Sequence, residues 1–126
     1  MTLPAFMAVA LGGAAGSVAR YCVQQSELLS GSRTWPTIAV NIAGCFLIGV
    51  AAVMFGRRGT AEMRLLCVTG FLGGFTTYST FMLDAATLLR AGEYRTAALY
   101  VGVSLVGGLM AFAAGWAATE KLTGLT

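Results

Sequence analysis

The residues of this chain that could carry chemistry are mostly neutral, and they lie inside its most apolar segments. Hydroxyl side chains follow a pair of glycines in the stretch GFLGGFTTYSTF, residues 70–81. The other polar side chains inside apolar runs are those of Asn41, Tyr100, Ser104 and Arg20. A small anion needs hydrogen-bond donors to replace the water that it loses in a dry interior. Because these groups are rich in neutral donors and poor in acids, they predict a small-anion pathway.

The stretch at residues 70–81 is unfavourable for one continuous helix. Glycine in a helix interior costs about 1 kcal/mol relative to alanine, and threonine and serine hydroxyls compete with the helical hydrogen bonds. We therefore expect a helix break near the bilayer midplane. Unwound backbone at that depth must be buried in protein or line a cavity, where freed carbonyls can coordinate a small cation. The alternative is an intact helix whose hydroxyls bond back to its own carbonyls.

The isolated polar residues also have ordinary structural interpretations. Asn41 can form a hydrogen bond between two helices, and Ser104 can bond back to its own helix. Arg20 can extend its long side chain to the membrane surface. Tyr100 precedes Ser104 by four residues, so both hydroxyls lie on the same helical face. The spacing alone leaves the structural and the functional interpretation open for each.

Aromatic residues recur along the third apolar segment at spacings that place them near one helical face: Phe71, Phe75, Tyr78 and Phe81. Such a stripe is more often packing than pore. Aromatic ring edges nevertheless carry partial positive charge, so they can face an anion without offering a full charge that would trap it.

Four long apolar segments must position these residues. The chain has 126 residues, of which 57% are hydrophobic and 10% charged, against about 25% charged in soluble domains. The segments span about residues 3–25, 37–55, 65–89 and 97–118, each close to the roughly 20 residues that cross a bilayer as a helix. We expect one all-α membrane domain of four transmembrane helices. The first segment lacks the basic start of a signal peptide, so we interpret it as a retained span.

The composition also excludes several classes of protein. Histidine is absent, and Cys22, Cys45 and Cys67 lie far apart in apolar runs, as small buried hydrophobes do. With no nucleophile–base pair or metal-ligand cluster in view, we do not expect an enzyme. The basic residues are scattered rather than clustered, so nucleic acid is not an expected partner.

The loop charges favour neither orientation in the membrane. Lys and Arg normally set the orientation through their excess on one side. Here four lie on each side: Arg57, Arg58, Arg64 and Lys121 on one, and Arg20, Arg33, Arg90 and Arg95 on the other. We therefore expect dual topology, with a homodimer of oppositely inserted subunits. The alternative is a coincidental tie with another signal fixing the orientation.

Glycines are frequent in the apolar segments and predict close helix packing, since small residues let membrane helices approach. They include Gly12 and Gly16 in the first segment, Gly44 and Gly49 in the second, and Gly102, Gly107, Gly108 and Gly115 in the fourth. Four short, tightly packed helices leave little interior volume for a polar pathway. This again favours a dimer.

The sequence resembles the Fluc (CrcB) family of fluoride channels. The similar stretches are GGAAGSVARY in the first segment, NIAGCFLIGV in the second, GFLGGFTTYSTF in the third and YVGVSLVGG in the fourth. They cover all four segments in order, and the third is the most specific. The resemblance implies an antiparallel dual-topology homodimer with two fluoride pores in the bacterial inner membrane. It implies passive fluoride efflux that lowers cytoplasmic fluoride and protects from fluoride toxicity.

The resemblance also implies which residues do the work. A structural central sodium ion would be held by main-chain carbonyls that map onto Gly73 and Thr76, and oxygen ligands suit this hard cation. The residues of the fluoride pathway map onto Arg20, Asn41, Tyr78, Phe81, Tyr100 and Ser104, with Ser79 and Thr80 bordering it.

Three positions depart from the family pattern. Tyr78 stands in place of the first pore phenylalanine and adds a hydroxyl. Gly108 stands where some members have a second serine, so that part of the polar track is missing. Asp84 stands where a glutamate is often found and is one methylene shorter.

Two other classes of function compete with a channel. Small multidrug exporters are also four-span antiparallel dimers, but they need a carboxylate in the first span, and residues 1–26 contain none. The other competitor is an accessory membrane subunit without transport activity.

Overall fold

The chain is helical throughout most of the part that the structure describes. The computed structural model describes residues 4–26, 31–32, 34–57 and 59–124. Its elements are α1 (Ala5–Gln24), α2 (Trp35–Arg57), α3 (Ala61–Arg64), the π-helix η1 (Leu65–Leu72), α4 (Gly73–Phe75), α5 (Tyr78–Arg90) and α6 (Tyr94–Thr123). Arg33, Arg58 and the expected start of the first span at residue 3 lie outside the described residues.

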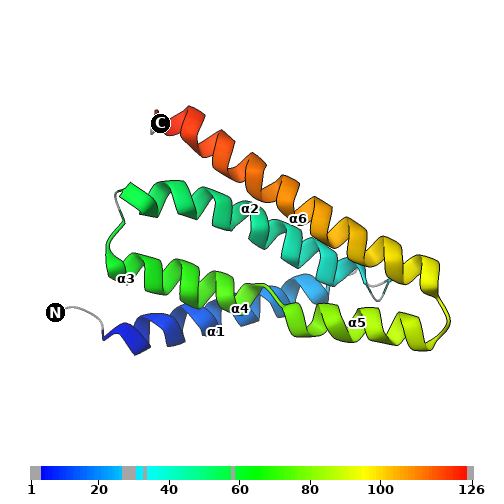
Figure 1. Cartoon of the computed structure of the whole chain (residues 1–126). Coiled ribbons are helices and arrows are strands. Elements are labelled where there is room, and N and C mark those ends of the chain that lie inside the picture. The colour runs from blue at the N-terminus through cyan, green and yellow to red at the C-terminus, as the bar shows by residue number, and fades with distance from the viewer. Residues whose placement is uncertain (1–3, 27–30, 33, 58, 125–126) are drawn as a thin grey trace.

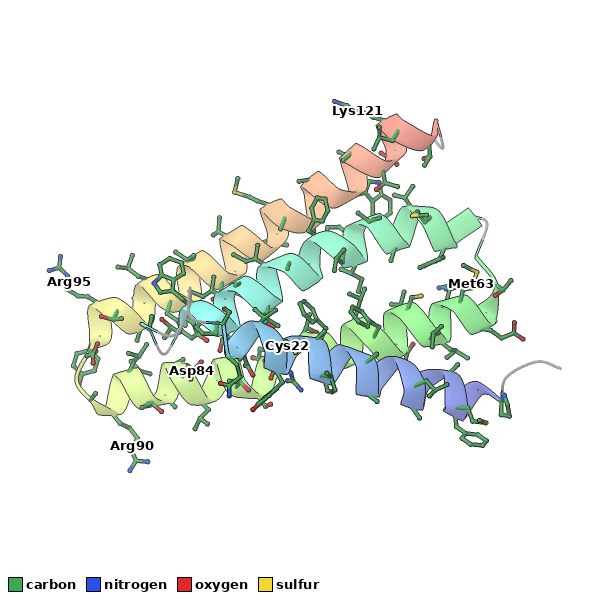
Figure 2. All side chains as sticks on the ribbon, turned by 180° about the vertical axis from the view of Figure 1, so that it is seen from behind. Cys22, Met63, Asp84, Arg90, Arg95 and Lys121 are labelled. Carbon is green, nitrogen blue, oxygen red and sulfur yellow. The ribbon has the colours of Figure 1, made fainter. Side chains whose placement is uncertain are left out.

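Four helical runs are long and apolar enough to cross a membrane. They are Ala5–Gln24, Trp35–Gly56, Ala61–Arg90 and Tyr94–Thr123. This confirms the prediction of an all-α chain with four long apolar helices. Large apolar side chains are exposed on the outer faces of the runs, as a surface in contact with lipid or another protein requires. Charged side chains extend from the ends of the molecule, Arg90 and Arg95 at one end and Lys121 at the other (Figure 2).

The long helices pack as two groups. α2 lies beside α6 along much of its length, and α1 packs against η1 and α4 (Figure 1). Glycines make both contacts possible, because small residues let helices approach closely in a membrane. A Cβ atom added to Gly49 would collide with the carbonyl oxygen of Phe112, and one added to Gly115 with that of Phe46.

Glycines of α1 also lie in close contact with a neighbouring helix, whereas one glycine of α6 does not. A Cβ on Gly12 would collide with the carbonyl oxygen of Leu66, and one on Gly16 with that of Phe71. Gly102 differs, because an added Cβ there meets open space in the single chain. The close helix contact predicted for nearly all of these glycines is therefore not made by Gly102 within the single chain.

The third run is irregular at two places. Residues 65–72 form a π-helix, which was not predicted from the sequence. π-Helical turns are rare and often mark functional sites. After the single α-helical turn of α4, Thr76 (φ −78°, ψ 158°) and Thr77 (φ −148°, ψ 115°) have extended backbone. α5 then begins at Tyr78. Figure 1 shows this short non-helical link between α4 and α5.

A small core near this link joins α2, α5 and α6. It consists of Ile38, Phe81, Ala85, Leu88, Ala97 and Tyr100. These residues come from the start of α2 and from α5 and α6, the two helices joined by the turn at Gly92. The polar residues around the core are therefore held by packed neighbours. The extended link therefore lies close to this apolar core cluster.

Candidate functional site

An open groove lies beside the extended link. Its volume is about 400 Å³, and it is formed by α2, η1, α4, α5 and α6. Six predicted site residues line it: Asn41, Gly73, Thr76, Tyr78, Phe81 and Ser104. The lining also includes Gly44, Cys45 and Thr77. The predicted residues Arg20, Ser79, Thr80 and Tyr100 are not part of it, so the groove collects only some of the expected pathway.

The Asn41 side chain is bonded to the main chain of the extended link. Its Nδ2 donates to the carbonyl oxygen of Thr77 at 3.0 Å, and the N–H of Thr77 donates to its Oδ1 at 2.8 Å. The structure thus shows Asn41 of α2 bonded to the main chain of the non-helical link, whereas the alternative interpretation of this residue was a bond between two helices. A carboxamide nitrogen carries two hydrogens, and among the described residues only one of them has a bonded partner.

The carbonyls of Gly73 and Thr76 have lost their helical donors. In a continuous α-helix the N–H of residue i bonds the carbonyl of residue i−4. The N–H of Thr77 donates to Asn41 instead of Gly73, and the N–H of Thr80 donates to Thr77 Oγ1 at 3.2 Å instead of Thr76. The Thr76 hydroxyl bonds back to the carbonyl of Leu72 at 2.9 Å. The two predicted cation ligands are therefore available main-chain acceptors.

A small hydroxyl cluster surrounds Thr77 at the start of α5. Thr77 Oγ1 lies 3.1 Å from Thr80 Oγ1 and 3.4 Å from Ser79 Oγ. Ser79 is exposed and Thr80 half-buried, and both meet the groove only through Thr77. Thr77 was not among the site residues predicted from the sequence. The sequence could have indicated Thr77 as the N-cap of α5, because threonine is a favoured N-cap residue and its side chain accepts from an N–H two or three residues further on, here that of Thr80.

Asp84 is the centre of a buried polar cluster next to the groove. Its Oδ2 accepts hydrogen bonds from Thr37 Oγ1 at 2.9 Å and from the Tyr100 hydroxyl at 3.2 Å. All three side chains are buried, and Figure 2 shows Asp84 within the bundle while Arg90 and Arg95 extend outward. Tyr100 is therefore held against Asp84 rather than in the groove. Thr37 was missed because its partner is 47 residues away.

The aromatic residues form two separate pairs. Phe71 and Phe75 stack with ring centroids 5.9 Å apart, and Tyr78 lies 5.8 Å from Phe81. Because the extended Thr76 and Thr77 separate the pairs, the prediction of one continuous aromatic face is wrong. Tyr78 is 73% exposed and Phe81 only 5%, so their rings present different surfaces to the groove.

The Ser104 hydroxyl is buried without a hydrogen-bond partner among the described residues. This argues against the back-bonded interpretation of Ser104. An unsatisfied buried hydroxyl costs about 1–3 kcal/mol, so a ligand that accepts its hydrogen would recover that free energy. Arg20, in contrast, is half-buried near the end of α1 and outside the groove lining, and its role stays a prediction.

One protein family and several known proteins are similar to this chain over most of its length. The family described as "CrcB-like protein, Camphor Resistance (CrcB)" matches residues 7–116. A protein of Rhizobium etli named "Fluoride-specific ion channel FluC" is 48% identical over 118 residues, which cover 90% of this chain and 94% of the relative. Proteins of the same name from Agrobacterium fabrum and Bordetella petrii are 48% and 44% identical, and cover 90% and 93% of this chain and 94% and 92% of their own lengths. On the extent of these matches, the chain belongs to the CrcB family.

Proposed function

We propose that this multi-pass membrane protein is a fluoride-specific ion channel of the bacterial inner membrane. It would give passive fluoride efflux, lower the fluoride concentration in the cytoplasm and protect the cell from fluoride toxicity. The names of the relatives support fluoride as the ion. The observation that carries the proposal in this chain is that two neutral donors line the same groove. The Ser104 hydroxyl has no hydrogen-bond partner among the described residues, and the Asn41 amide uses one of its two hydrogens for Thr77.

The chemistry of the groove fits an anion. Its lining within the described residues contains no Asp, Glu, Lys or Arg, so no carboxylate repels an anion and no full positive charge traps it. Neutral donors and the ring edges of Tyr78 and Phe81 would replace the water of fluoride in steps. Conduction needs binding that is strong enough for entry and weak enough for exit.

Efflux needs no energy source in this proposal. Fluoride enters cells as an uncharged weak acid and ionises again in a more neutral cytoplasm. The anion is then concentrated inside and leaves down its gradient through an open pathway. The function is therefore a channel function, without enzyme chemistry.

The functional unit would be an antiparallel homodimer with dual topology. In the single chain the groove is open on one side, Gly73 is exposed, and the Tyr78 ring is mostly uncovered. A second copy facing the extended link would cover these groups. The even division of Lys and Arg between the two sides of the membrane supports opposite insertion of the copies.

A structural sodium ion would lie where the two links meet. The carbonyls of Gly73 and Thr76 fit this ion because their helical donors are bonded elsewhere, and hard cations prefer oxygen ligands. When bound, the cation would offset the partial negative charges of carbonyls from both subunits and so hold the dimer together.

Fluoride release from liposomes tests the function. Purified protein is reconstituted into liposomes loaded with potassium fluoride, valinomycin balances the charge, and a fluoride electrode records efflux. We expect rapid fluoride release from liposomes that contain protein, and little chloride release in matched liposomes. Drug-coupled proton flux would instead support a small multidrug exporter, and the absence of any flux would support an accessory subunit.

A further inference from the structure

We propose that Asn41 and Thr77 are positioning residues that keep the Gly73 and Thr76 carbonyls free to bind a cation. Each does so by capturing a main-chain N–H that would otherwise occupy one of these carbonyls. The inference rests on the proposed cation site. It assigns to Asn41 a role toward the main chain in addition to its place in the groove.

Asn41 acts on the Gly73 carbonyl from a different helix. Its amide pairs with both the N–H and the carbonyl of Thr77, 36 residues away along the chain. The position is well fixed, because the adjacent Val40 is fully buried. Gly44, one turn later in α2, is close enough to the link that an added Cβ would collide with Thr76 Cγ2. The absence of a side chain there lets Asn41 reach the main chain of Thr77.

Thr77 acts on the Thr76 carbonyl from within the link. Its hydroxyl oxygen accepts from the N–H of Thr80 at 3.2 Å and caps the start of α5. Thr77 is only 6% exposed and Thr80 is half-buried, so water has limited access to the two main-chain N–H groups that Thr77 and Asn41 bind. The hydroxyl hydrogen of Thr77 bonds Thr80 Oγ1 at 3.1 Å, which fixes its orientation.

Removal of either side chain would leave a buried N–H that must find another acceptor, because buried backbone groups are nearly always paired. The helical acceptor of the Thr77 N–H is the Gly73 carbonyl, and that of the Thr80 N–H is the Thr76 carbonyl. The helix would therefore extend into the link and occupy a carbonyl needed for the cation. Asn41 and Thr77 thus decide whether the link presents free oxygens or a closed helix.

The test measures the sodium dependence of thermal stability, which does not require channel activity. Purified protein in detergent is unfolded in Na⁺ and in N-methyl-glucamine at equal ionic strength. For the unsubstituted protein we expect Na⁺ to raise the Tm by on the order of 5 °C when the ion is well above its Kd. Asn41→Leu and Thr77→Val should each lose most of this rise, whatever their Tm without Na⁺.

Two controls separate this effect from general damage. Thr87→Val makes the same change at a threonine of α5 whose hydroxyl bonds back to the Leu83 carbonyl at 2.7 Å, and it should keep the full rise. Thr77→Ser retains the capping hydroxyl and should also keep it. Ser104→Ala should keep the rise while its fluoride flux falls, because Ser104 does not bond the link.

The outcomes are distinct. An undiminished Na⁺ effect in Thr77→Val and Asn41→Leu would overturn the inference. If Asn41→Leu does not fold, the Thr77→Val and Thr77→Ser pair decides, since equal Na⁺ effects in these two variants also overturn it. A protein that conducts fluoride but shows no Na⁺ effect without any substitution would remove the cation site itself. A protein with a full Na⁺ effect and no fluoride flux would remove the channel and leave the positioning role intact.

Discussion

The α2–α6 pair and the third run differ in the regularity of their backbones. α2 and α6 are continuous helices whose glycines bring backbone against backbone, as at Gly49 and Gly115. The third run contains a π-helix, two extended residues and main-chain groups that are bonded by side chains. The α2–α6 pair carries Asn41 and Ser104, which line the groove beside the irregular third run. The close-packed α2–α6 pair, called the frame below, buries the unwound backbone of the third run in protein, and unwound backbone is tolerated in a membrane only under such conditions.

The largest expected effect comes from a change of charge where the frame meets the link. Asn41→Asp places a carboxylate in the groove, where it repels an anion and faces the Thr77 carbonyl. We expect fluoride efflux from liposomes to fall at least about 100-fold, because like charges in a poorly solvated site interact by several kcal/mol. Size-exclusion chromatography should show an assembled dimer. Efflux at the unsubstituted rate would remove Asn41 from the pathway.

The frame itself can be broken by a single methyl group. Gly115→Ala puts a Cβ against the carbonyl oxygen of Phe46, and overpacking of this kind costs about 1–3 kcal/mol. We expect a lower Tm of the purified protein. Gly102→Ala in the same helix is the matched control, since its Cβ meets open space in the chain, and it should leave the Tm unchanged or slightly raised. Equal Tm values for both variants would show that α2 and α6 do not depend on this contact.

Ser104→Ala sharpens the comparison, because fluoride efflux should fall without a loss of stability. The variant removes a buried hydroxyl that has no partner among the described residues, so the free energy of unfolding should stay equal or rise by about 1 kcal/mol. Fluoride efflux should fall about 10-fold, since a lost hydrogen bond to an ion is worth roughly 1.5–3 kcal/mol. A loss of stability together with normal efflux would show that Ser104 serves helix packing and not fluoride conduction.

The smallest expected effect concerns the two aromatic pairs on either side of the link. Phe81→Ile removes a ring edge from the groove, and an aromatic interaction is worth about 0.5–1.5 kcal/mol. We expect a decrease in fluoride efflux of about 2- to 10-fold. Phe71→Ile, in the pair that does not line the groove, serves as the control and should conduct normally. If the two variants conduct equally well, the ring-edge role of Phe81 is lost.

The long helices could be predicted because apolar length and loop charge are local properties of the sequence. The neutral polar residues also drew attention to Asn41 and Ser104, which line the groove. The contacts that give them meaning could not be predicted. Asn41 meets Thr77 across 36 residues, and Thr37 meets Asp84 across 47, so both depend on how the helices pack. The π-helix was missed for the same reason, since it is fitted against the glycines of α1.

α6 has a further consequence for the setting of the protein. Its 30 residues make a rod of about 45 Å at 1.5 Å per residue, whereas the hydrocarbon layer of a bilayer is about 30 Å thick. The surplus must be taken up by tilting of the helix or by terminal turns that stand among the lipid headgroups. The charged residues Glu120 and Lys121 lie near the end of α6, so its last turn suits the headgroup layer. Because α6 and α2 are in close contact at Gly49 and Gly115, a tilt of α6 in the membrane would also tilt the helix that carries Asn41.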